Sequence, residues 1–103
     1  MATTTALAER IESGLRSLLA EVADLPNTAQ EWDGLPVWNQ ASIALDWSHR
    51  MADALTELER YYRSGAMTPE QQAHYRALRG QLRQALPLIT RLDFYRPPVP
   101  LGE

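Results

Sequence analysis

Apolar residues recur at helical spacing over three stretches of the chain, about residues 5–25, 36–63 and 69–92. In the first stretch they fall within roughly 120° of a helical wheel, while charged residues such as Arg16 occupy the other side. This pattern predicts a helix that buries one face. We expect it to end before Pro26, because proline restricts the preceding residue and donates no backbone hydrogen bond.

The second stretch predicts a long central helix whose apolar residues cover about 220° of the wheel. A helix with so much apolar circumference packs on more than one side, and Gly65 is expected to end it as a left-handed cap. Two occupants for the surplus surface remain open: the C-terminal segment 94–103, or a second copy of the chain. We expect the second copy, because three helices of this size bury a modest core. The interface is predicted to include the large apolar residues Trp38, Leu45, Trp47, Met51, Leu55, Leu58 and Tyr62.

The third stretch carries a clear helix start. Thr68 is the predicted N-cap, Pro69 takes the first helical position, and Gln71 completes a capping box. Apolar residues then repeat at alternating spacings of three and four, which is typical of a coiled-coil seam. Pro87 interrupts the repeat, so the helix either kinks there or ends near Leu86.

The connection between the first two helices, residues 27–37, contains two large aromatic side chains. Trp32 and Trp38 are expected to fold back over the end of the bundle, since each indole needs both burial and a partner for its N–H group. The competing interpretation is an exposed aromatic binding site.

Together these elements predict an all-α fold, a three-helix bundle with a long central helix. The short connection around Gly65 implies that the second and third helices form an antiparallel hairpin, against which the first helix packs. Residues 94–103 contain three prolines and are expected to form an extended, Pro-rich C-terminal tail. The whole chain, residues 1–103, is expected to be a single helical domain.

Composition excludes several kinds of chemistry. The chain has no Cys, and all ten basic residues are Arg. A thiol nucleophile, a disulfide framework, a zinc knuckle, a Schiff base and a phosphate-loop lysine are therefore excluded. No apolar run approaches the length of a membrane span, and the N-terminus lacks the pattern of a signal peptide, so we expect no membrane partner and a cytoplasmic location.

The net charge of −3 hides an asymmetry along the chain. Residues 1–59 carry three Arg and ten acidic residues, whereas residues 60–103 carry seven Arg and three acidic residues. Two interpretations of the Arg-rich half compete: ion pairs between helices, or recognition of a phosphorylated ligand or nucleic acid. We expect the ion pairs, because the acidic remainder of the surface would repel a polyanion. The residues of the alternative anion site are Arg60, Arg63, Arg76, Arg79 and Arg83.

Two sets of residues are candidate metal ligands. One set forms two Glu-x-x-acid pairs that resemble the magnesium-binding motifs of all-helical nucleotide pyrophosphohydrolases, and the other lies on the polar face of the second helix. Each set lies on one helix, so a metal-dependent hydrolase would have to assemble across a dimer. The sets are Glu9, Glu12, Glu21 and Asp24, and Asp46, His49 and Asp53.

The sequence contains no Gly-rich phosphate loop, no Ser/His/Asp arrangement and no nucleotide-cofactor fingerprint, so we assign neither catalytic residues, nor a metal, nor a cofactor. We predict a noncatalytic helical protein that acts by protein–protein association, most simply as a homodimer. A heterologous protein partner is left open, and nucleic acid is not expected.

Overall fold

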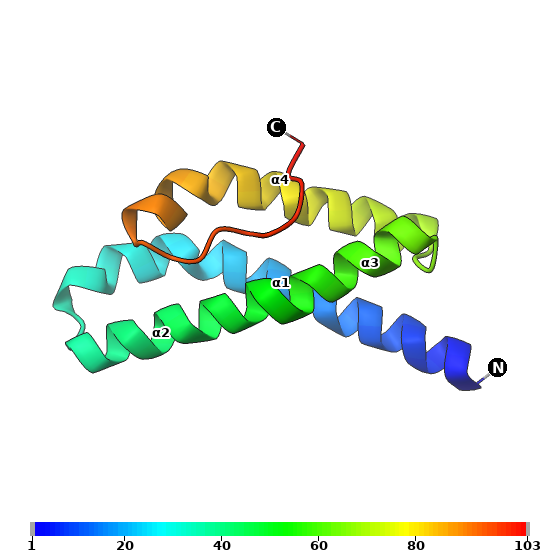
Figure 1. The fold of residues 1–103 in the computed structure, drawn as a ribbon, viewed down its shortest axis with the longest axis horizontal. Helices are drawn as coiled ribbons and strands as arrows, with labels where there is room; N and C mark the ends of the chain where they lie inside the picture. The colour runs from blue at the N-terminus through cyan, green and yellow to red at the C-terminus, as the bar shows by residue number, and fades with distance from the viewer. Residues whose placement is uncertain (1, 103) are drawn as a thin grey trace.

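The computed structural model describes residues 2–102, and the prediction of an all-α fold is confirmed over that range (Figure 1). Two short segments differ from the α-helices: η1 is a tight 3₁₀ turn, and η2 is a wider π-helical segment. The elements in chain order are α1 (Ala2–Glu31), η1 (Trp32–Gly34), α2 (Val37–His49), η2 (Arg50–Leu55), α3 (Thr56–Ser64) and α4 (Pro69–Arg91).

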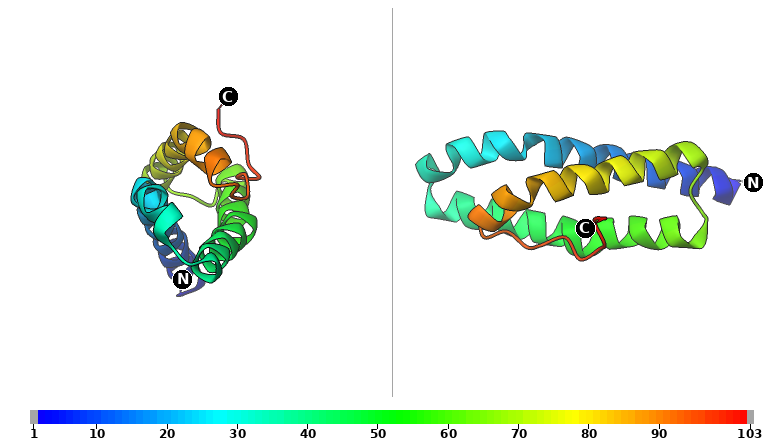
Figure 2. Two further views of the ribbon diagram at one scale, coloured as in Figure 1. Left: turned by 90° about the vertical axis from the view of Figure 1, so that its left-hand side faces the viewer. Right: turned by 90° about the horizontal axis from the view of Figure 1, so that it is seen from above.

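Three long helical rods lie side by side along the longest dimension of a molecule that measures 49 × 29 × 18 Å (Figures 1 and 2). The middle rod consists of α2, η2 and α3, which follow one another without a break, and we call it the central rod. Helix α1 packs along α4. The chain reverses direction after η1 and again after α3, where Gly65 adopts the left-handed conformation that the sequence predicted (φ 80°).

Helix α1 does not end before Pro26, so that expectation is wrong. It continues to Glu31, with Pro26 on its exposed side. Leu25 and Ala29 are buried on the same face as the residues before them. Proline costs the helix one backbone hydrogen bond, and burial of this last apolar turn offsets the loss.

Helix α4 begins as predicted. The Thr68 hydroxyl accepts a hydrogen bond from the Gln71 backbone N–H, and the Gln71 side chain accepts one from the Thr68 N–H, both at 3.1 Å. The sequence left open whether this helix kinks at Pro87 or ends near Leu86, and it does not end there: it continues through the exposed Pro87 to Arg91. The buried Ile89 extends the apolar seam of α4 into this last turn.

All three rods contribute large side chains to one hydrophobic core. In α1 and α4 the buried positions follow spacings of three and four, as in the predicted seams. The central members of the core are Ile11, Leu15, Leu18 and Val22 from α1, Trp47, Met51, Leu55 and Leu58 from the central rod, and Tyr75, Leu78, Leu82 and Ile89 from α4.

The π-helical segment η2 is explained by the spacing of the buried residues in the central rod. Trp47, Met51 and Leu55 follow one another at intervals of four. In a regular α-helix each such step rotates a side chain by about 40° away from the previous one. A π-helix has more residues in each turn, so it reverses this drift and keeps all three residues toward the core.

The residues after α4 run back along the molecule between α4 and the central rod (Figure 1), and we call residues 92–102 the tail. The Phe94 ring packs edge-on against Trp32, with ring centroids 5.2 Å apart, and lies tilted by 36° against Trp47, with ring centroids 5.6 Å apart. The Trp47 Nε1–H donates a hydrogen bond of 2.8 Å to the Tyr95 carbonyl oxygen. Leu101 is also buried. The tail therefore covers one side of the central rod.

Candidate functional site

Most residues predicted for a protein interface lie inside the monomer. Trp47, Met51, Leu55 and Leu58 are core residues and are not available at its surface. The reason is that α1, α4 and the tail together enclose more of the central rod than the sequence pattern indicated. Tyr62 is half-buried, with its ring centroid 5.0 Å from that of Tyr75.

The remaining two predicted interface residues lie on an exposed apolar face of α2. Trp38 is 74% exposed and Leu45 is 57% exposed, and they share this face with Val37 (79%) and the exposed Ala41. We call these four residues the α2 stripe. Trp38 therefore does not fold back over the bundle, whereas Trp32 does pack against Phe94.

The chain carries no charged residue from position 37 to position 45, which is two and a half turns of a surface helix. An exposed helix normally has charged residues on its solvent face. Depletion of charge together with an exposed tryptophan is typical of the centre of a protein interface. The sequence already contains this charge-free stretch. It did not stand out, because apolar residues occupy so much of the predicted central helix.

The five arginines of the predicted anion site do not act as one group. Arg63 forms an ion pair with Glu59, and the Arg83 guanidinium donates a hydrogen bond of 2.9 Å to the Gly102 carbonyl oxygen. Arg60 lies over the Tyr61 ring at 5.9 Å. The expected pairing with carboxylates on other helices is therefore limited, and two of the five guanidinium groups, those of Arg60 and Arg79, lie over tyrosine rings instead.

Arg76 and Arg79 converge on Tyr62. The Arg79 guanidinium carbon lies 4.9 Å from the centroid of the Tyr62 ring and 5.4 Å from that of Tyr75. A hydrogen bond from Arg76 and the positive charge of both arginines hold the pKa of the Tyr62 hydroxyl below its ordinary value. This corner of the α3–α4 hairpin is electropositive.

A buried carboxylate that the sequence did not single out lies beneath this corner. Glu59 accepts a hydrogen bond of 2.6 Å from the Tyr75 hydroxyl and another from Arg63. Burial raises the pKa of Glu59, but the hydrogen bonds from Tyr75 and Arg63 outweigh it and hold the pKa below the ordinary value. Glu59 was hard to predict because its partner on α4 lies sixteen residues away in the sequence.

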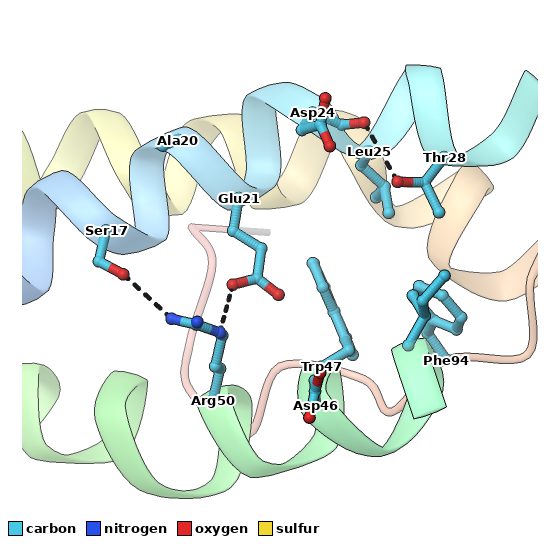
Figure 3. A pocket seen from close by; sticks show the side chains of 11 residues that line it. Ser17, Ala20, Glu21, Asp24, Leu25, Thr28, Asp46, Trp47, Arg50 and Phe94 are labelled. Carbon is cyan, nitrogen blue, oxygen red and sulfur yellow. Dashed lines mark hydrogen bonds and ion pairs between the residues drawn. The ribbon is translucent and has the colours of Figure 1, made fainter. Parts of the chain in front are cut away.

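A groove of about 680 Å³ opens between α1 and α2 (Figure 3), and we call it the α1–α2 groove. Arg50 crosses it, forming an ion pair of 2.6 Å with Glu21 and donating a hydrogen bond of 3.0 Å to the Ser17 hydroxyl. Burial raises the pKa of the Glu21 carboxyl, with a further contribution from Asp46 and against the lowering effect of Arg50. The rings of Trp47 and Phe94 form part of its lining.

The candidate metal ligands on α1 have different interaction partners. Glu12 accepts a hydrogen bond from Gln71, Glu21 pairs with Arg50, and Asp24 accepts a hydrogen bond from Asn27. Among residues 2–102 no group of three or more His, Asp or Glu side chains is arranged to hold a metal ion.

Comparison with protein families, curated proteins and solved structures found no match to this chain. In the part of the chain that the structure describes, no helix is both long enough and apolar enough to cross a membrane.

Proposed function

We propose that this protein is a noncatalytic helical protein that self-associates through the α2 stripe. The observation that carries the proposal is the exposed Trp38 on a charge-free helical face, in a monomer whose other large apolar side chains are mostly buried. Exposed apolar patches of this kind mark interaction surfaces. We also propose the cytoplasm as its compartment, as expected from the sequence.

A second copy of the chain suits this face because the stripe is complementary to itself. Consider two α2 helices that cross antiparallel about a two-fold axis between Ala41 and Ser42. Trp38 then faces the partner subunit's Leu45, because both lie about 5 Å from the axis along the helix. The small side chains at the axis allow the two backbones to approach closely. The two-fold symmetry repeats the tryptophan–leucine contact, so Trp38 and Leu45 of both copies take part in it.

Sedimentation equilibrium tests the proposal. The wild-type chain is expected to show a monomer–dimer equilibrium between about 1 μM and about 1 mM, which corresponds to binding free energies of about −8 to −4 kcal/mol. Trp38→Ala is expected to reduce the binding free energy by about 2 kcal/mol per copy, or about 4 kcal/mol per dimer. This loss weakens dimerisation about 1,000-fold. Leu45→Glu is expected to abolish it, because it places two carboxylates in the apolar contact.

The matched control is Gln84→Glu, which adds the same charge at an exposed position of α4. It is expected to dimerise like the wild-type chain. All three variants should retain the wild-type circular dichroism spectrum, because the substituted side chains are exposed. A wild-type chain that stays monomeric at 1 mM, or a Trp38→Ala variant that dimerises normally, would contradict the proposal.

We propose a second candidate function, the binding of a phosphorylated ligand at Tyr62, Arg76 and Arg79. The specific observation in its favour is the convergence of both guanidinium groups on the Tyr62 side chain. Arginine presents several donors in a planar arrangement that matches phosphate oxygens.

The probe for this second candidate is inorganic phosphate, titrated into isotope-labelled protein at low ionic strength. Signals of Tyr62, Arg76 and Arg79 are expected to shift, and the affinity should fall as salt screens the charges. The double variant Arg76→Gln/Arg79→Gln should abolish the shifts, whereas Arg91→Gln, at an exposed position near the end of α4, should leave them unchanged. Phosphate-induced signal shifts of equal size in both variants would contradict the proposal that phosphate binds at this site.

A further inference from the structure

His49 continues the line of the α2 stripe along the central rod. It lies four residues beyond Leu45, and residues at this spacing share one face of a helix. The His49 side chain is exposed and forms no hydrogen bond or ion pair with any residue from 2 to 102. Imidazole ordinarily gains a proton between about pH 8 and about pH 5, so His49 changes the charge at this edge of the stripe close to neutral pH. The charged residues next to it are Asp46, Arg50 and Asp53 on the same rod and, through its ion pair with Arg50, Glu21 on α1.

The end of the molecule that carries the stripe is acidic, and we call it the acidic end. The chain contains no Arg between Arg16 and Arg50. The end of α4 and the start of the tail also lie at this end, because Phe94 packs against Trp32. The charged residues of the acidic end are Asp24, Glu31, Asp33 and Asp46 from α1, η1 and α2, and Arg91, Asp93 and Arg96 from α4 and the tail. Carboxylates therefore outnumber guanidinium groups there by five to two.

The two-fold contact described above brings two acidic ends together. Its axis lies about 7 Å along the rod from Val37, the first residue of α2, so the two central rods overlap over only about 14 Å and then extend in opposite directions. His49 lies about 11 Å from the axis, beyond the start of the partner subunit's α2. It is therefore beside the segment that leads into that helix and carries the partner's Asp33. While His49 is neutral, the like charges of the two acidic ends oppose association.

We propose that protonation of His49 promotes self-association through the α2 stripe, an inference that rests on the proposed function. Each protonated imidazole places a positive charge beside the acidic end of the partner, and the two-fold symmetry repeats this interaction. Aspartate and glutamate ordinarily lose their protons near pH 4, so the acidic end stays negative while imidazole titrates. The dimer therefore favours the protonated form of His49, and self-association strengthens as the pH falls from about 8 to about 5.5.

The inference is tested by measuring the dimer dissociation constant at about pH 8 and about pH 5.5, by sedimentation equilibrium at low ionic strength. The wild-type chain is expected to dimerise about tenfold more tightly at the lower pH. His49→Gln carries no charge and is expected to show the weaker, high-pH affinity at both pH values. His49→Arg is always charged and is expected to show the tighter, low-pH affinity at both.

The matched control is His74→Gln, which removes the other of the two histidines of the chain. His74 lies on α4, with its Nδ1 4.0 Å from a Glu12 carboxylate oxygen, and this variant should respond to pH like the wild-type chain. Circular dichroism at both pH values reports whether each variant folds. A wild-type chain that is monomeric at both pH values would refute self-association itself and this inference with it. The role of His49 alone is overturned if the wild-type dimer is equally tight at both pH values, if His49→Gln still responds to pH, or if His49→Arg dimerises no more tightly than His49→Gln.

Discussion

The double variant Phe94→Ala/Leu101→Ala is expected to be largely unfolded at room temperature. Both side chains are buried, and they anchor the two ends of the tail against the helices. Truncation of a buried Phe costs about 3–5 kcal/mol, and truncation of a buried Leu costs about 2–5 kcal/mol. Their sum, about 5–10 kcal/mol, is comparable to the whole stability of a domain of this size, about 5–15 kcal/mol.

The measurement is urea denaturation followed by circular dichroism, applied to the double variant and to each single variant. Tyr95→Ala is the matched control, because its side chain is 46% exposed and its carbonyl oxygen, which accepts the Trp47 N–H, is retained. We expect the control to change the free energy of unfolding by less than about 1 kcal/mol. A double variant as stable as this control would mean that the tail does not pack against the central rod.

Tyr75→Phe is the second variant with a large expected effect. It removes the 2.6 Å hydrogen bond to the buried Glu59 carboxylate and changes little else in the core. Hydrogen bonds to charged groups contribute about 1.5–3 kcal/mol, so the free energy of unfolding at neutral pH should fall by that amount. The matched control is Tyr61→Phe, which removes a 2.8 Å hydrogen bond to Glu57 at a less buried site, and its cost should be below about 1 kcal/mol.

The effect of Tyr75→Phe on stability is expected to depend on pH. The folded-state pKa of Glu59 lies below its unfolded value, so the charged carboxylate stabilises the fold above the unfolded pKa, and this contribution is lost as the pH falls through the folded pKa. The difference in stability between the wild-type chain and Tyr75→Phe should therefore narrow under acidic conditions. Carbon-detected NMR titration should also show a higher pKa for Glu59 in the variant. A stability difference that stays constant from neutral to acidic pH would contradict this role of the hydrogen bond.

The helices, and the turn between the last two, were predictable because their signals are local. The Thr68 capping box and the left-handed Gly65 depend on side chains within a few residues of each other. At Pro26 the predicted helix end is wrong, and at Pro87 an end was one of two alternatives; both helices continue for the same reason. Local propensity disfavours proline within a helix, but in both cases the adjoining apolar residues continue a buried seam, and tertiary packing outweighs the local cost.

The candidate sites were less predictable, because each depends on residues that are distant in the sequence. Trp38 and Leu45 were identified as interface residues together with Trp47, Met51, Leu55 and Leu58, and the sequence could not separate the two groups. The α1–α2 groove combines side chains from α1, α2 and the tail, so no single motif contains it. The convergence of Arg76 and Arg79 on Tyr62 likewise requires α3 and α4 to be folded against each other.

The sequence by itself determined that the chain is helical, which stretches form the helices, and that the central helix has more apolar surface than one neighbour can cover. Those properties follow from periodicity and from local backbone preferences. Only the tertiary structure decided which part of that surface is buried and which part is exposed. The tail reaches the central rod through a hydrogen bond between residues 48 positions apart, and such a contact depends on how all the helices pack rather than on any local pattern. The part of α2 that the tail leaves uncovered is the face on which we propose that two copies meet.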